Sequence, residues 1–220
     1  MQTASSGEKI APDRTFSIVS TQQGSVILAT LKERTQPLHA MVEGEVNIFR
    51  RIATPKDYAR LLARLYGFYL PLDALLADIP GLSSLGIDFA PRRKAPLLRA
   101  DLAEFGWSEE RVRALPLCAE LPDLNTLSRA LGTLYVVEGA TLGGQIIGRQ
   151  LSQNLAVTPE RGGRFFASYG ENVRAMWASL GATLIAHANT ADIETSVVQS
   201  ACDTFSAFIR WFQKENDVAR

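Results

Sequence analysis

Apolar side chains recur along most of this chain at the three-to-four-residue spacing of an amphipathic helix. The spacing holds from Ile27 to Phe49, from Tyr58 to Tyr69 and along the stretch that ends near Leu155. Alternating runs rich in Val and Ile, bounded by turns, would mark strands, and the sequence contains none. The pattern therefore predicts an all-α fold with a single domain.

Capping and breaking residues predict where the helices begin and end. We expect Ser25 to cap a first helix that runs to about Arg51, with Pro37 bending or dividing it. A second helix is expected to begin after a cap at Thr54, with Pro55 in its first position. Further helices are expected over residues 97–105, 108–115, 123–155, 171–186 and 191–215.

Three segments differ from this helical pattern or limit it. Residues 1–24 are polar and are expected to form a flexible extension. Residues 80–96, which contain three prolines, are expected to be a connector. Residues 25–220 are expected to form the folded domain, which is long enough to bury a sizeable core.

Composition excludes several classes of protein. The chain has 23 Lys and Arg against 23 Asp and Glu, so no overall positive field would draw it to nucleic acid or to a membrane surface. No apolar run approaches the about 20 residues of a membrane span, and no secretory signal is visible. The two distant cysteines, Cys118 and Cys202, form no disulfide framework, so we expect a cytoplasmic protein.

The stretch from Tyr135 to Gly148 combines helical apolar spacing with an excess of glycine. Each glycine costs a helix interior about 1 kcal/mol relative to alanine. A helix that accepts this cost four times is expected to need close approach, either of another helix or of a flat, bulky ligand. The glycines are Gly139, Gly143, Gly144 and Gly148.

The chain has two histidines, and only His39 lies within an apolar helix face. Glu43, one turn later, could accept its second N–H and raise its basicity toward a metal. Taken alone, such a histidine is more often a surface or core residue, and His187 fits a cation at a helix end. Heme iron is already bound by four porphyrin nitrogens, however, so the protein needs to supply only one imidazole as a ligand. His39 and the glycine stretch together are suited to holding a planar macrocycle.

With these features, the chain resembles the heme oxygenases over about residues 26–216. The resemblance rests on four motifs in family order, of which the third is most similar to bacterial members, including those associated with bacteriophytochromes. The motifs are Leu31-Lys-Glu-Arg-Thr with His39 and Glu43, the Tyr58–Tyr69 segment, Glu138-Gly-Ala-Thr-Leu-Gly-Gly-Gln145, and the Thr204–Phe212 segment.

The resemblance implies a helical bundle with heme b between the first helix and a glycine-kinked distal helix. It makes His39 the iron ligand, with Glu43 near its second nitrogen. The catalytic distal wall would be the backbone at Gly139 and Gly143. The other heme contacts that it implies are Gly144, where the helix bends, Lys32 and Arg174 at the propionates, Tyr135 and Phe205.

Four of these further contacts also have a plainer explanation. Lys32 and Arg174 could be solvated surface charges, while Phe205 could be a core residue and Tyr135 a helix-packing residue. One position departs from the family pattern, because many members carry an aspartate directly after the first distal glycine and this chain has Ala140. Water near bound dioxygen would then be held by the backbone or Thr141, or the activity differs.

The resemblance implies oxidative cleavage of heme to biliverdin, with release of CO and ferrous iron. Dioxygen and an external electron donor, a ferredoxin or a reductase, would be required, because no flavin or nicotinamide motif is present. A bacteriophytochrome is a candidate acceptor for the biliverdin.

Two other functions stay open at this stage. One is a non-catalytic heme-binding protein for storage, delivery or sensing. The other is a thiamin-salvage hydrolase of the same architecture, which would need a cysteine nucleophile; neither Cys118 nor Cys202 is convincingly placed for that role.

Overall fold

The computed structural model describes residues 15–46 and 52–214, and within them the protein is built from helices. The long helices are α1 (Thr15–Val46), α3 (Pro55–Ala77), α6 (Leu127–Leu155), α8 (Val173–His187) and α9 (Ala191–Gln213). The shorter ones are α4 (Ala95–Glu104), α5 (Glu109–Arg113), α7 (Arg164–Ala167) and the 3-10 turns η1 (Ser83–Leu85), η2 (Ala90–Arg92) and η3 (Gly170–Asn172). The described residues contain isolated β-bridges at Thr158 but no strand, so the all-α prediction is confirmed.

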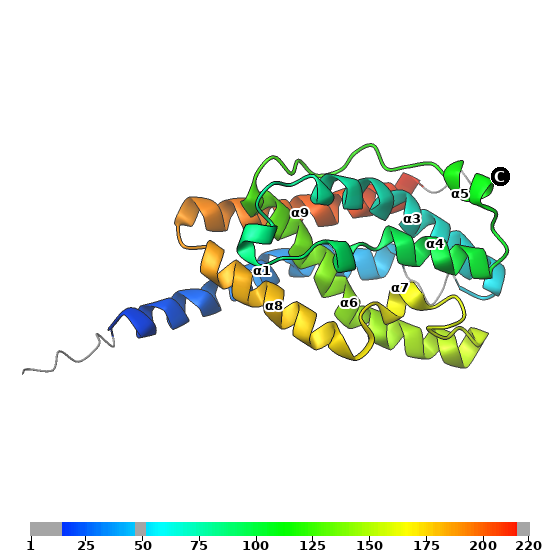
Figure 1. Cartoon of the computed structure of the whole chain (residues 1–220), viewed down its shortest axis with the longest axis horizontal. Coiled ribbons are helices and arrows are strands. Elements are labelled where there is room, and N and C mark those ends of the chain that lie inside the picture. The colour runs from blue at the N-terminus through cyan, green and yellow to red at the C-terminus, as the bar shows by residue number, and fades with distance from the viewer. Residues whose placement is uncertain (1–14, 47–51, 215–220) are drawn as a thin grey trace, which may run out of the picture.

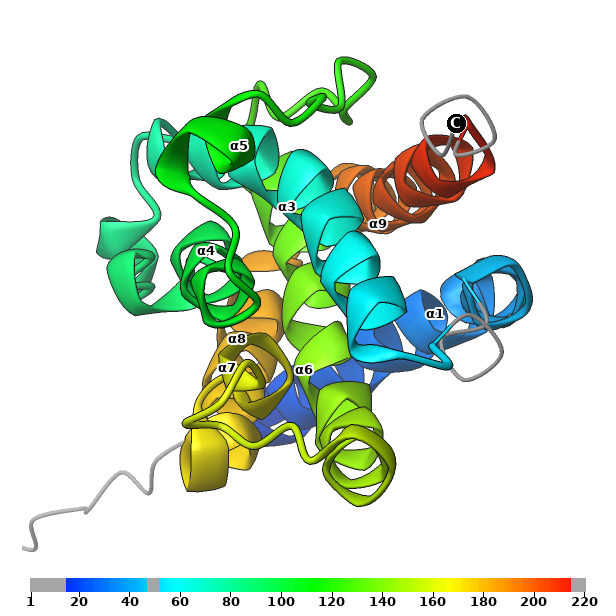
Figure 2. The same cartoon turned by 90° about the vertical axis from the view of Figure 1, so that its right-hand side faces the viewer.

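Helix α6 lies at the centre of the bundle (Figures 1 and 2). Helices α8 and α9 pack against it, and α1 packs across both α8 and α9. Helix α4 packs on α3 and on α7, which in turn rests on α6. Figure 2 shows α1 and α4 on opposite sides of α6, so anything held between α6 and its neighbours is enclosed by segments far apart in sequence.

The crossing of α6 and α9 depends on a glycine that the sequence pattern did not single out. A Cβ at Gly132 would collide with the backbone oxygen of Val197, on α9. Only a residue without a side chain permits this approach. Fully buried leucines from several helices contribute to the core, among them Leu31, Leu62 and Leu131.

Helix starts that depend on local caps are close to the predicted ones. The Thr54 hydroxyl accepts from the Asp57 N–H at 3.2 Å, and the Asp57 carboxylate accepts from the Thr54 N–H at 3.0 Å, which is a complete capping box. Helix α6 begins at Leu127 rather than near residue 123, because the Thr126 hydroxyl caps it by accepting from the Arg129 N–H.

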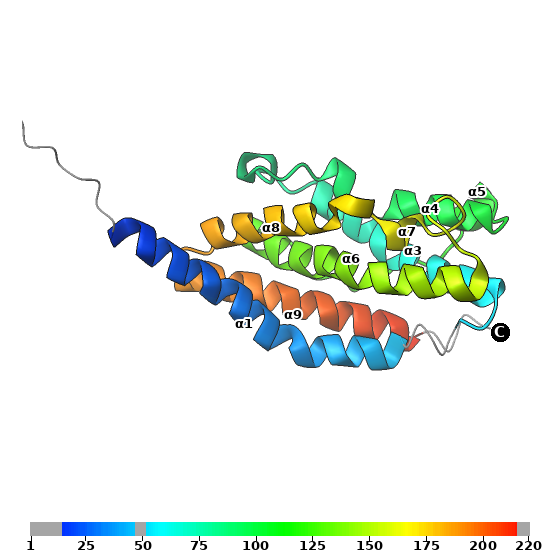
Figure 3. The same ribbon diagram turned by 90° about the horizontal axis from the view of Figure 1, so that it is seen from below.

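The predicted start of the first helix is wrong. Helix α1 begins at Thr15, so the backbone of residues 15–24 is helical, and residues 1–14 of the predicted flexible extension lie outside the described residues. Ser25 is an interior residue of α1, not its cap. Helix propagation is cooperative and no proline lies between residues 15 and 36, so the helix continues upstream. Pro37 does not divide α1, and Figure 3 shows the helix bent along its length.

Candidate functional site

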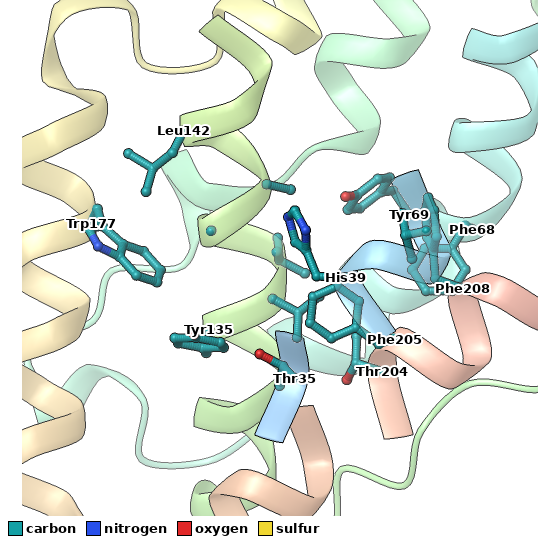
Figure 4. A pocket seen from close by; sticks show the side chains of 15 residues that line it. Thr35, His39, Phe68, Tyr69, Tyr135, Leu142, Trp177, Thr204, Phe205 and Phe208 are labelled. Carbon is teal, nitrogen blue, oxygen red and sulfur yellow. The ribbon is translucent and has the colours of Figure 1, made fainter. Parts of the chain in front are cut away.

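A cleft lies between α1 and α6 and consists of two adjoining lobes. The lobes have volumes of about 280 and 400 Å3; the second lies in the range of small-molecule and cofactor sites and the first just below it. His39 from α1 and Gly139 and Ala140 from α6 line both of them. The first lobe extends toward Trp177 of α8, as Figure 4 shows, and the second toward Phe166 of α7.

His39 presents a free imidazole nitrogen to this cleft. Its side chain is 60% exposed, and Figure 4 shows the ring extending from α1 toward α6. The Nδ1 atom lies 3.6 Å from the Glu43 carboxylate, which is beyond hydrogen-bond distance but on the expected side of the ring. The edge-on ring of Phe205 packs beside the imidazole, at 6.0 Å between centroids. Nε2 is thus the nitrogen available to bind a metal.

Two of the glycines on α6 form a wall of bare backbone across the cleft from His39. A Cβ at Gly143 would meet nothing within 4 Å, so the position faces open space in the second lobe. A Cβ at Gly139 would lie 3.6 Å from the Trp177 ring, which is ordinary contact. A flat ligand could therefore approach the α6 backbone closely at both positions.

Gly144 serves a different purpose from its neighbour Gly143. A Cβ at Gly144 would lie 2.9 Å from the backbone oxygen of Phe166, so the glycine lets α7 pack directly on α6. The two explanations that the sequence left open, a close helix and an open ligand space, therefore apply to adjacent residues. Gly144 also lines the second lobe, between α6 and α7.

Helix α7 itself was not expected from the sequence. Its first N–H groups are held by the buried carboxylate of Asp101, which accepts from Arg164 N at 2.9 Å and from Phe165 N at 2.8 Å. A carboxylate at a helix N-terminus satisfies unpaired N–H groups and the positive end of the helix dipole. Because Asp101 lies more than 60 residues upstream, no local pattern could have revealed this helix.

The structure brings some of the predicted heme contacts to the cleft and leaves others outside it. Tyr135 lines the first lobe and packs against Trp177 at 5.4 Å between ring centroids; burial raises its pKa, while the Thr35 hydroxyl acts to lower it. Phe205 also lines this lobe. Lys32 and Arg174 are exposed and do not line either lobe. Their contact with propionates stays a prediction.

A buried cluster of charges beside the glycine wall was missed by sequence reasoning. The Glu138 carboxylate is fully buried and accepts hydrogen bonds from Arg92 at 2.8 Å, Lys94 at 3.2 Å and Tyr169 at 2.7 Å. Of the four, Lys94 lines the second lobe. The signal that could have revealed it is a glutamate within the apolar run that precedes Gly139, because a buried carboxylate needs buried cations.

Neither cysteine is placed to act as a nucleophile in this cleft. Cys118 is buried, and burial raises the pKa of its thiol; the pKa of Cys202 is raised for the same reason. Neither residue lines either lobe. A cysteine-dependent hydrolase is therefore poorly supported.

The part of the chain that the structure describes contains no group of three or more His, Cys, Asp or Glu residues arranged to hold a metal ion. None of its helices combines the length and the apolar character needed to traverse a bilayer.

Comparison with known proteins agrees with this geometry. A family model described as heme oxygenase matches residues 25–214. Among solved structures, the chain is similar to the NO- and CO-bound heme oxygenase from Neisseria meningitidis, with 19% sequence identity and a TM-score of 0.67 over 86% of this chain and 90% of that one. Comparison with curated proteins gives no sequence match. The structural likeness shows a shared fold, and because the family model spans most of the sequence, the chain belongs to the heme oxygenase family.

Proposed function

We propose that the protein cleaves heme b oxidatively to biliverdin and releases CO and ferrous iron. The observation that carries the proposal is that His39 and the bare backbone of Gly139 and Gly143 line the same cleft. The residues present fit heme, because the cleft has apolar walls, one imidazole and an opposite side without side chains. When bound, heme supplies both the iron that activates dioxygen and the ring that is opened.

The chain's own residues then have defined tasks. His39 would hold the iron through Nε2, and Glu43, which lies on the side of Nδ1, would orient the imidazole. Gly139 and Gly143 would leave room for a small ligand of the heme and would border it with backbone alone. Phe205 packs on the imidazole and would contact the edge of bound heme beside it.

Three further parts of the site follow from the same placement. Tyr135 supplies a hydroxyl at the rim of the first lobe, and Gly144 keeps α7 against the second. Lys32 and Arg174, both exposed, are free to turn toward the propionates of bound heme. The rotation of heme in its plane, and so the carbon that is cleaved, would depend on those two cations.

The partners proposed for the reaction are dioxygen and an external electron donor, a ferredoxin or a reductase. A bacteriophytochrome is the proposed acceptor of biliverdin, on the strength of the Glu-Gly-x-x-Leu-Gly-Gly form of the motif that begins at Glu138. Cys118 and Cys202, both unpaired, suit a reducing compartment such as the cytoplasm.

The central experiment is aerobic incubation of the heme complex with a reductant, followed by chromatography of the bilin. We expect the Soret band to disappear, biliverdin to form and CO to be released in equal amount. A Soret band that survives air and reductant would refute cleavage and favour storage or sensing, the candidate that Ala140 supports by offering no polar group beside Gly139.

The chain offers a matched pair of variants because it has only two histidines. His39→Ala is expected to lose the parental Soret spectrum while the protein stays folded, since the side chain is mostly exposed. His187→Ala is the control, because Nε2 of His187 is engaged with the Ser128 hydroxyl at 3.1 Å and the residue does not line the cleft. If His39→Ala keeps the parental spectrum, the assignment of the iron ligand is wrong.

A further inference from the structure

The charged cluster around Glu138 is unusual for its place in the molecule. Glu138, Arg92 and Lys94 are all nearly inaccessible to solvent, although they lie directly behind a cleft with mostly apolar walls. Burying charges costs several kcal/mol per ion unless partners compensate for the lost water. A hydrophobic replacement would serve stability as well, so the cluster is a candidate for a functional role.

The hydrogen bonds of the cluster and the lining of the cleft together point to one group that a ligand can reach. Arg92 Nε is buried without an acceptor, but Arg92 lines neither lobe. The Tyr169 hydroxyl donates to Glu138 Oε1 at 2.7 Å, so its oxygen is free to accept from Lys94 Nζ at 2.8 Å. Lys94 Nζ also donates to Glu138 Oε1 at 3.2 Å. An ammonium has three N–H groups. Within the described residues, two of the three on Lys94 have acceptors, and Lys94 is the member of the cluster that lines the second lobe.

The position of Lys94 is also fixed from its backbone. The buried carboxylate of Asp73 accepts from the backbone N–H of Lys94 at 2.8 Å and of Ala95 at 2.7 Å, at the start of α4. Lys94 is therefore held at both ends, by Asp73 at the backbone and by Glu138 and Tyr169 at the ammonium. A donor that is held in place before a ligand arrives loses little entropy when the ligand binds.

The second lobe has Lys94 on one side and His39 on another. His39 comes from α1 and Lys94 from the start of α4, and these helices lie on opposite sides of α6 (Figure 2). Gly143 also lines this lobe and carries no side chain that would enter it.

We propose that the Lys94 ammonium is a ligand-binding group of the distal side: it donates a hydrogen bond to a small anion or diatomic molecule bound to the heme iron opposite His39. This inference rests on the proposed function in one respect, that heme occupies the cleft with His39 as its iron ligand. It assigns to Lys94 the polar contact that Ala140 does not provide. Burial lowers the pKa of Lys94 while Glu138 opposes the change, so this ammonium is a better proton donor than an exposed lysine.

The probe is azide, an anion that binds ferric heme and accepts hydrogen bonds. Azide is titrated into the ferric-heme complex of the parent and of Lys94→Met, and its dissociation constant is read from the Soret shift. A hydrogen bond from a charged donor accounts for roughly a ten- to hundredfold difference in affinity. We expect azide to bind Lys94→Met at least about tenfold more weakly; a change within about threefold would overturn the proposal.

A double variant separates the donor from the charge and also guards against misfolding. Lys94→Met leaves the buried Glu138 carboxylate with one cation fewer to compensate for its charge. Combining Lys94→Met with Glu138→Gln restores the net charge of the cluster and removes the under-compensated carboxylate. If the donor matters, the double variant still binds azide about tenfold more weakly than the parent. Parental affinity in the double variant would mean that only net charge acts, and would refute a direct contact.

Arg129→Met is the matched control. It removes a partly buried cation from the first turn of α6, where Arg129 pairs with Asp203 at 2.6 Å, away from the cleft. Azide affinity is expected to stay parental, and a comparable loss would show that the Lys94 result is not specific. The azide titration requires heme on His39 but no ring cleavage, so the failure of this inference and the failure of the proposed activity are distinguishable.

Discussion

Alanine at position 143 is expected to stabilise the heme-free protein and to impair the heme-loaded one. The neighbouring substitution, Gly144→Ala, is expected to destabilise the heme-free protein. Both residues are interior glycines of α6, so their intrinsic helix propensities are the same. They differ in what an added Cβ would meet, which is open space at Gly143 and the backbone of Phe166 at Gly144.

The magnitudes follow from these surroundings. Replacing a helical glycine by alanine gains roughly 0.5–1 kcal/mol. For a chain of this size, 1 kcal/mol shifts the melting temperature by about 2–4 °C, so Gly143→Ala should raise the Tm of the heme-free protein by a few degrees. At Gly144 the same gain is opposed by a contact of 2.9 Å with a backbone oxygen that must move aside. Overpacking costs typically about 1–3 kcal/mol, which leaves a net loss of up to about 2.5 kcal/mol.

Gly143→Ala is expected to weaken heme binding, although it stabilises the heme-free protein. Its new methyl group would enter the second lobe, where the proposed heme lies against the backbone. An overpacking cost of about 1–3 kcal/mol corresponds to heme binding that is roughly 5- to 150-fold weaker. Heme titration followed at the Soret band measures this, and thermal melts of the heme-free proteins by circular dichroism measure the stability.

Two results would refute the reasoning. If both variants lower the melting temperature alike, position 143 does not face open space. If Gly143→Ala is more stable and also binds and degrades heme as the parent does, heme does not lie against this part of α6.

Two further substitutions test the energetics around the cleft. Burial raises the pKa of Asp73 from 3.8 to about 6, despite hydrogen bonds and cations that act to lower it. The folded protein therefore holds this proton more tightly than the unfolded chain does. The stability that the protonated group contributes is lost as the pH rises through about 6. Asp73→Asn should therefore be more stable than the parent by on the order of 1–3 kcal/mol at pH 7.5 and equally stable at pH 4, as urea denaturation would measure; the same difference at both pH values would contradict this linkage. Tyr58→Phe removes a buried hydroxyl that donates to the Gly162 carbonyl at 2.9 Å, and should lower the melting temperature by about 2–4 °C without changing the heme spectrum; an unchanged melting temperature would mean that this hydrogen bond contributes nothing net.

Local interactions account for the parts of the fold that the sequence predicted well. The capping box of α3 joins Thr54 and Asp57, three residues apart, and the hydroxyl of Ser108 caps α5 by accepting from the Arg111 N–H. Such contacts depend little on the rest of the molecule, so the residue pattern alone identifies them. The all-α class follows in the same way, from apolar spacing repeated over long segments.

Contacts between distant segments account for the features that the sequence did not reveal. The interior of α1 packs on α8 and α9, and the Thr30 hydroxyl donates to Glu194 of α9 across 164 positions of sequence. Helix α7 depends on Asp101, and the charge cluster joins Glu138 to residues more than 40 positions upstream. A pattern read over one or two helical turns has no access to these partners.

The sequence by itself determined that this protein is a helical bundle, with His39 on one helix and a run of glycines on another. It could do so because periodicity, caps and residue type are local properties. Residue type and spacing marked Gly143 and Gly144 equally, and only the family resemblance gave them different tasks. Only the tertiary structure decided that Gly143 borders the open cleft and Gly144 the backbone of α7. Successive residues of a helix point about 100° apart, and which direction meets a neighbour is set by how the helices pack, not by the residues themselves.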